Sequence, residues 1–362
     1  MKKQHQHFIP QVYLRKFAHT QDGDNYFVDT FNKVTGELKP SMSIANICGE
    51  NDLYTLKNLG GNQKYTVENF FSKNIESEYN RVYELLVQEK KKIISADERV
   101  LILNTILSMY FRTPKALNQF VTFSATLIDQ VKKELDIEVI DFLGYKISVK
   151  EKSFTDLKKE IKENNRLDYI KTQLILLNEF IKFRAYDGLV VIELVGEQEF
   201  ITSDNPVEIG NSFGGNFSLF DTSNSIYIPL DSKHVLFIAP KKEMAIVNQI
   251  FYWRDNFSQH IVTNKNIFEN AERWIIGSET SITKFLKDKA EYDKPANKNH
   301  YLVTKEKIEL IQKLEILIEG GISNDNQKLV NFLKNLPKHD LYNKHIDLQN
   351  IYNKMKEVGL QI

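Results

Sequence analysis

The spacing of apolar residues changes from a helical to a strand pattern near residue 185. From Val67 to Phe183 apolar residues recur mainly every three or four positions, which predicts helices. From Leu189 to Ala239 they fall in short runs rich in β-branched and aromatic residues, punctuated by glycine and proline, which predicts strands. A helical stretch followed by a β-rich stretch is typical of the α+β class.

Several helix boundaries in the first stretch have specific signals. The lysines at 90–92 are expected to end the helix that begins near Val67, because cations are favourable at a helix C-terminus. Ser95 and Glu98 match a capping box for the next helix. Pro114 disfavours helical geometry at the residue before it, so Arg112 is expected at a break. The other elements expected here are a helix to 135, a strand within 136–152 and helices over 154–183.

The β-rich stretch and the chain ends complete the predicted fold. The runs at 189–195, 200–202, 226–228 and 235–239 are expected to form one antiparallel sheet. A β-ribbon is expected over 26–31 and 33–38, and helices over 264–276, 305–319 and 327–336. The prediction is therefore an α+β fold, a mostly helical body with a small antiparallel sheet and an N-terminal β-ribbon. Residues 1–285 are expected to form one body, and 286–362 a helical C-terminal extension.

Composition narrows the class of protein. The 362 residues carry 48 Lys and Arg against 48 Asp and Glu, so no overall attraction to nucleic acid or to an acidic membrane is expected. The single cysteine, Cys48, excludes an internal disulfide and is predicted to be a small buried hydrophobe. No apolar span of 18 residues is present, so we expect a soluble, cytoplasmic protein without a membrane partner.

The first seventeen residues concentrate imidazole and aromatic side chains. His5 and His7 are two positions apart, so in an extended segment both project from the same face. Pro10 can start a helix on which Tyr13 and Phe17 share a side and anchor the segment. The histidines suit acid/base chemistry, a phosphate contact or a metal pair. The alternative is a mobile terminus that carries two histidines by chance, or one histidine within a structural hydrogen-bond network.

A second polar cluster follows the predicted strand at 200–202. The turn at 202–206 places Ser203, Asp204 and Asn205 at a strand end, where scaffolds often present functional groups. Asp204 is able to pair with Arg112 or to bind a cation. The alternative is a turn in which these three side chains satisfy their own backbone.

These segments together resemble the DUF4238 family of uncharacterised prokaryotic proteins. The shared pieces are His7-Pro10-Tyr13-Leu14-Phe17, Arg112-Thr-Pro114, Thr202-Ser-Asp-Asn-Pro206, Tyr227-x-Pro229-Leu230 and Ala271-x-Arg273, in this order across residues 4–280. The resemblance brings no settled activity. It implies that the pieces meet in space.

The leading hypothesis is a hydrolase-like effector that acts on nucleic acid or nucleotide phosphodiesters. His7 is the predicted acid/base, Arg112 the anion clamp and Asp204 the base or metal ligand. The residues expected to assist them are Tyr13, Ser203, Asn205 and Asn266 as ligand contacts, and Glu68 or Glu76. A divalent metal on His5, His7 and Asp204 is an alternative. The rival hypothesis is a non-catalytic binding or scaffold protein in which the same residues form a structural ion-pair network.

Overall fold

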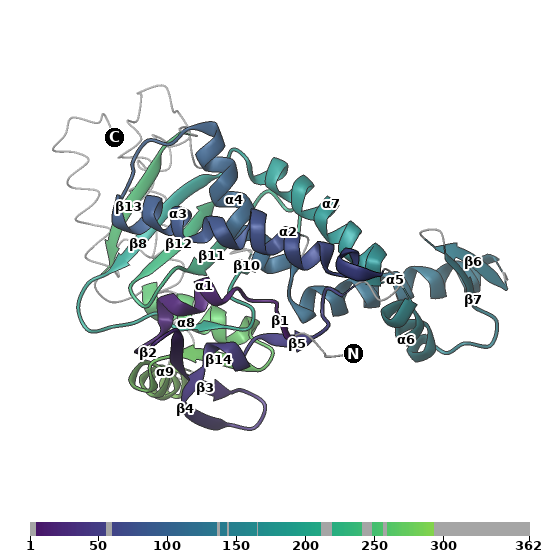
Figure 1. The fold of residues 1–362 in the computed structure, drawn as a ribbon, viewed down its shortest axis with the longest axis horizontal. Coiled ribbons are helices and arrows are strands. Elements are labelled where there is room, and N and C mark those ends of the chain that lie inside the picture. Colours follow the sequence, from purple (N-terminus) through teal and green to yellow (C-terminus); the bar gives the residue numbers. More distant parts are fainter. Residues whose placement is uncertain are drawn as a thin grey trace, which may run out of the picture.

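Two β-sheets and the helices packed on them dominate the described part of the chain, which confirms the α+β class (Figure 1). The computed structural model describes residues 5–55, 60–135, 138–142, 145–164, 166–210, 219–240, 248–255 and 259–292. The helices expected at 305–319 and 327–336 lie outside these ranges, and the division at residue 285 stays a prediction.

The larger sheet is mixed. Its described strands run in the order β10-β11-β12-β8-β13, and β13 lies parallel to β8 while the other pairs are antiparallel. Their bounds are β8 Gly188–Leu194, β10 Glu208–Gly210, β11 Ser225–Pro229, β12 His234–Ala239 and β13 Ile250–Asp255. The prediction of one small antiparallel sheet is therefore wrong on two points. The sheet is larger than predicted and partly parallel, and the run predicted at 200–202 joins the other sheet instead. Alternating patterns specify the faces of a strand and leave its partners open.

The smaller sheet combines the N-terminal ribbon with two later strands. The ribbon prediction is confirmed, because β3 pairs with β4, and β14 then joins β3 to β9. The bounds are β2 Thr20–Asp22, β3 Asn25–Asn32, β4 Glu37–Ser43, β9 Thr202–Ser203 and β14 Trp274–Gly277. The helix expected over 264–276 is wrong at both ends, since α8 spans Gln259–Asn270. Lys33 Nζ donates to the carbonyls of Phe268, Glu269 and Ala271 at 2.7–3.1 Å and so closes the end of α8.

One face of the larger sheet packs against the helices, and Figure 1 shows α3, α4 and α7 beside it. Leu189, Val191 and Leu236 from the sheet share a buried cluster with Ile102 and Phe180 from these helices. The helix bounds are α2 Thr66–Asn74, α3 Tyr79–Tyr83, α4 Ala96–Phe111 and α7 Arg166–Arg184. The capping box at Ser95 and Glu98 is confirmed, and α4 ends at Arg112 as the prediction from Pro114 requires.

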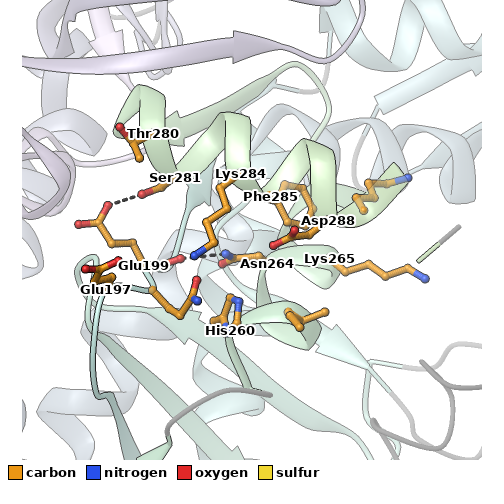
Figure 2. Close-up of a pocket in the computed structure, with 13 residues that line it drawn as sticks. Glu197, Glu199, His260, Asn264, Lys265, Thr280, Ser281, Lys284, Phe285 and Asp288 are labelled. Atoms are coloured by element: carbon orange, nitrogen blue, oxygen red, sulfur yellow. Dashed lines mark hydrogen bonds between the residues drawn. The ribbon is translucent and has the colours of Figure 1, made fainter. Parts of the chain in front are cut away.

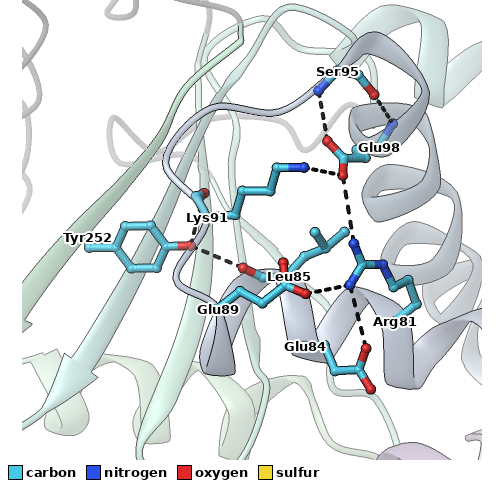
Figure 3. Close-up of polar contacts among 8 residues, drawn as sticks. All are labelled: Arg81, Glu84, Leu85, Glu89, Lys91, Ser95, Glu98 and Tyr252. Atoms are coloured by element: carbon cyan, nitrogen blue, oxygen red, sulfur yellow. Dashed lines mark hydrogen bonds and ion pairs between the residues drawn. The ribbon is translucent and has the colours of Figure 1, made fainter.

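The helix expected from Val67 to the lysines at 90–92 is interrupted. A 3₁₀ turn at Glu76–Glu78 follows α2, and α3 runs into a wide turn at Glu84–Gln88 in which Glu89 N–H donates to Glu84 O at 2.8 Å. The Tyr252 hydroxyl from β13 donates to the Leu85 and Lys91 carbonyls, and Arg81 pairs with Glu84 and Glu89 beside it (Figure 3). This junction fixes the direction in which α4 leaves.

A separate arm extends from α4. Helix α5, Pro114–Leu135, packs on α6, Phe154–Asn164, and on a hairpin of β6, Val139–Phe142, and β7, Tyr145–Ser148 (Figure 1). Val121, Ile128, Ile147 and Leu157 form its own small core. Helix α9, Glu279–Tyr292, packs on the smaller sheet. No helix among the described residues is both long and apolar enough to cross a bilayer.

Candidate functional site

The two N-terminal histidines are held on one strand. Strand β1, His5–His7, pairs antiparallel with β5, Gly49–Asn51, and helix α1, Gln11–Leu14, starts directly after Pro10. The two imidazoles lie edge to face with ring centroids 5.0 Å apart, as the prediction of a shared face requires. Gln6 points the other way, and its side-chain oxygen accepts a 2.6 Å hydrogen bond from Tyr54 N–H.

An open pocket of about 680 Å³ lies in front of these histidines. Its polar lining comes from β1 and α1 on one side and from α2 and the 3₁₀ turn on the other. The side chains concerned are His5, His7, Gln11, Arg15, Glu68 and Glu76. We call this space the His7 pocket. It is the place where the N-terminal segment meets the first long helical stretch.

Arg112 forms the back of the His7 pocket and does not line it. Its side chain is 1% exposed, and Nη2 donates to His7 O at 2.9 Å and pairs with Glu76 Oε1 at 2.7 Å. The guanidinium carbon lies 4.3 Å from the Phe71 ring centroid, a cation–π geometry. Arg112 therefore anchors the histidine backbone and the glutamate, and it has no open side to clamp an anion from the His7 pocket.

His7 and Glu68 have acid–base properties shifted in opposite directions. Burial lowers the pKa of His7 below its ordinary value of 6.5, and the nearby His5 lowers it further. Burial raises the pKa of Glu68 above its ordinary 4.5, against the opposing effect of Arg112. His7 Nε2 and Glu68 Oε2 are both buried without a hydrogen-bond partner among the described residues. Buried polar atoms without partners are uncommon in folded proteins.

Asp204 is held elsewhere by the backbone. Its Oδ1 accepts from Glu272 N–H at 3.0 Å, and Oδ2 accepts from Arg273 and Trp274 N–H at 2.7 and 3.0 Å. Burial raises the pKa of the Asp204 carboxyl, and these amides oppose the rise. None of the described hydrogen bonds or ion pairs joins Asp204 to His7 or Arg112, so the predicted pairing with Arg112 is not formed.

The predicted ligand contacts make mostly structural bonds. The Tyr13 hydroxyl shares a 2.5 Å hydrogen bond with Thr202 Oγ1, which ties α1 to β9. Ser203 Oγ accepts from Asn205 N–H at 3.1 Å, the local turn bond that was the alternative for this cluster. Asn266 is half-buried on α8 and makes no side-chain hydrogen bond among the described residues. Asn264 and Asn270 form the ties from this helix instead.

The predicted metal set is also not assembled. Within the described ranges, no three His, Cys, Asp or Glu side chains are grouped closely enough to hold a metal ion. His5 and His7 are together at the His7 pocket, whereas Asp204 makes its contacts with the 272–274 backbone.

Among the residues of the His7 pocket that the sequence did not point to, Gln11 and Arg15 have the longest polar side chains. Gln11 follows His7 by four positions, and its Nε2 lies 3.4 Å from His7 Nδ1. Arg15 follows Gln11 by four, and its guanidinium carbon lies 5.0 Å from the Tyr26 ring centroid. The i,i+4 spacing of Gln11 and Arg15 was the available signal, since both follow the predicted helix start at Pro10 and such residues share one helix face.

Comparison with known families gives a match over most of the chain. The model of the family described as "Protein of unknown function (DUF4238)" matches residues 5–281. Comparison with curated proteins and with solved structures gave no match. The matched range contains every residue of the His7 pocket and the Asp204 turn.

Proposed function

The chain belongs to the DUF4238 family of proteins of unknown function, and from the His7 pocket we propose that it is an acid–base hydrolase of nucleic acid or nucleotide phosphodiesters. The proposal rests on two side chains of the His7 pocket, those of His7 and Glu68. Both line the same open pocket, and their pKa values are shifted in opposite directions. Opposed shifts of this kind separate the roles of acid and base.

The two groups have complementary tasks in this reaction. A lowered pKa keeps the His7 imidazole neutral, so it accepts the proton of an attacking water. A raised pKa keeps the Glu68 carboxyl protonated to a higher pH, so it donates that proton to the leaving oxygen. One P–O bond forms to the water oxygen and one breaks to the leaving group. His7 gains one proton in this step and Glu68 loses one.

The other residues of the pocket bind and position. Arg15 lines the pocket from the 3₁₀ turn that follows α1, where its exposed guanidinium suits contact with a phosphoryl oxygen. Arg112 acts indirectly, because it holds His7 O and the Glu76 carboxylate at once. This assignment changes the anion contact from Arg112 to Arg15 and gives Asp204 no catalytic task.

A non-catalytic scaffold is the second candidate, and one observation favours it. Arg112 and Asp204, charged residues from two of the five shared pieces, are both buried and bonded mainly within the fold. Structural networks of this kind also perturb pKa values. In that case the His7 pocket would bind a partner without turning it over.

Hydrolysis of bis(p-nitrophenyl) phosphate by the full chain separates the two candidates. We expect measurable turnover, with kcat reduced by about a hundredfold or more in His7→Gln and in Glu68→Gln, because a general acid or base contributes about 10²–10⁴-fold. Glu78→Gln is the matched control. It makes the same change on the same helical stretch, outside the His7 pocket, and should leave kcat unchanged.

Substrate class is tested in the same assay. Single-stranded RNA and DNA oligonucleotides should be cleaved, whereas p-nitrophenyl acetate, a carboxylic ester without a phosphoryl group for Arg15, should not. Absence of turnover on every diester, or equal turnover by wild type, His7→Gln and Glu68→Gln, would contradict the enzyme proposal and favour the scaffold.

A further inference from the structure

A second cavity lies beside the segment that leads into β9, and none of its lining residues lines the His7 pocket. It has a volume of about 40 Å³ and is enclosed by the segment at 197–199 and by helices α8 and α9 (Figure 2). The proposed hydrolase makes no use of it. Polar residues nevertheless line this cavity and hold fixed positions.

The wall of this cavity is fixed by hydrogen bonds. Asn264 on α8 donates from Nδ2 to Glu199 O at 2.9 Å, and its Oδ1 accepts from Ile201 N–H at 2.9 Å. The Glu199 carboxylate accepts from the Ser278 hydroxyl at 2.8 Å and also from the Ser281 hydroxyl. The 197–199 segment is therefore attached to both helices, and the cavity is formed before any ligand arrives.

Two opposite charges on α9 face this cavity without pairing. Lys284 and Asp288 are one helical turn apart, a spacing at which opposite charges commonly form ion pairs. Neither forms an ion pair with any described residue, although both line the cavity. Figure 2 shows the two side chains extending from the same side of α9 toward Asn264. Each therefore has its charge available to a ligand.

The whole lining is electrically balanced. It contains equal numbers of lysines and carboxylates, namely Lys265, Lys284 and Lys289 with Glu197, Glu199 and Asp288. A ligand that carries one charge of each sign would match both Lys284 and Asp288.

We propose that this cavity binds a small zwitterion of the free α-amino acid class, with the ligand carboxylate on Lys284 Nζ and the ligand ammonium on the Asp288 carboxylate. The small volume favours ligands of the size of glycine, alanine or serine. Lys284 and Asp288 fix the orientation, as the few polar groups of a small-molecule site commonly do.

Equilibrium dialysis of the full chain with radiolabelled glycine and L-alanine tests the proposal. We expect saturable binding that acetate, methylammonium and inorganic phosphate compete for at least about tenfold less well, since each offers one charge only. Lys284→Gln and Asp288→Asn should each weaken amino-acid binding by about tenfold or more. Lys287→Gln, an exposed lysine on the same helix outside the cavity, should bind as wild type does.

Three results would overturn the proposal. One is no saturable binding of either amino acid up to about 10 mM, a range that covers even weak sites. Another is phosphate or acetate binding as tightly as alanine, which would make the cavity a simple anion site. The third is equal binding by wild type, Lys284→Gln and Asp288→Asn with all three folded by circular dichroism.

Discussion

Asp204→Asn gives the sharpest distinction between a structural and a catalytic aspartate. The carboxylate is 5% exposed and accepts three backbone N–H groups, one on Oδ1 and two on Oδ2. An asparagine keeps one acceptor oxygen and replaces the other with an NH₂ donor. Its best orientation places the oxygen toward Arg273 and Trp274, so the NH₂ group then faces the N–H of Glu272.

The magnitude follows from the bonds lost in that orientation. One hydrogen bond to a charged group is lost, at about 1.5–3 kcal/mol, and the two that remain become neutral and weaker. We therefore expect the free energy of unfolding to fall by about 3 kcal/mol, since two facing donors also repel. Catalysis of diester cleavage should persist, because Asp204 has no contact with the His7 pocket among the described residues.

Urea denaturation followed by circular dichroism measures the change, with Asp24→Asn as the control. Asp24 lies exposed beside the turn between β2 and β3, so its variant should stay within about 0.5 kcal/mol of wild type. The reasoning is refuted if Asp204→Asn is as stable as Asp24→Asn but has lost activity. That result would return Asp204 to the catalytic role expected from the sequence.

Three further predictions follow from the His7 pocket. The pH profile of kcat/KM should be bell-shaped, because His7 must be neutral and Glu68 protonated, and a rate that does not change with pH would contradict this. The folded protein binds a proton on His7 less readily than the unfolded chain does, so the contribution of neutral His7 to the free energy of unfolding is complete above pH 6.5 and is lost as the pH falls. The slope of the free energy of unfolding against pH, below pH 6.5, should therefore be smaller in His7→Gln than in wild type. An unchanged slope would count against burial of the imidazole. Gly49→Ala should move the His5 ring away from His7, because a Cβ at residue 49 collides with His5 Nε2. The His7 ring protons should then lose their ring-current shift in NMR spectra, and the free energy of unfolding should change by less than about 1 kcal/mol.

Local signals allowed a good part of the fold to be predicted. The Ser95–Glu98 capping box and the break before Pro114 depend on residues within four positions of each other, and both are present in the structure. The shared face of His5 and His7 follows from strand alternation alone. Cys48 is buried, as its apolar surroundings predicted.

Tertiary partners explain what could not be predicted. Residues 274–276 were assigned to a helix, but they pair with β3 from the N-terminal ribbon, more than 240 positions away. Arg112 was expected to meet Asp204, yet Glu76 is the carboxylate that reaches it, and Asp204 pairs with backbone amides that no side-chain pattern reveals. Charge types were visible in the sequence, whereas the choice among several carboxylates was set by packing.

The proposed chemistry depends on pKa shifts of opposite sign at His7 and Glu68, and NMR titration of both groups in the folded full chain measures these shifts. Histidine ring and glutamate side-chain carboxyl signals, assigned with His7→Gln and Glu68→Gln, give the two pKa values from one set of samples. We expect a pKa for His7 below 6.5 and for Glu68 above 4.5. A His7 pKa at or above 6.5 together with a Glu68 pKa at or below 4.5 would contradict it.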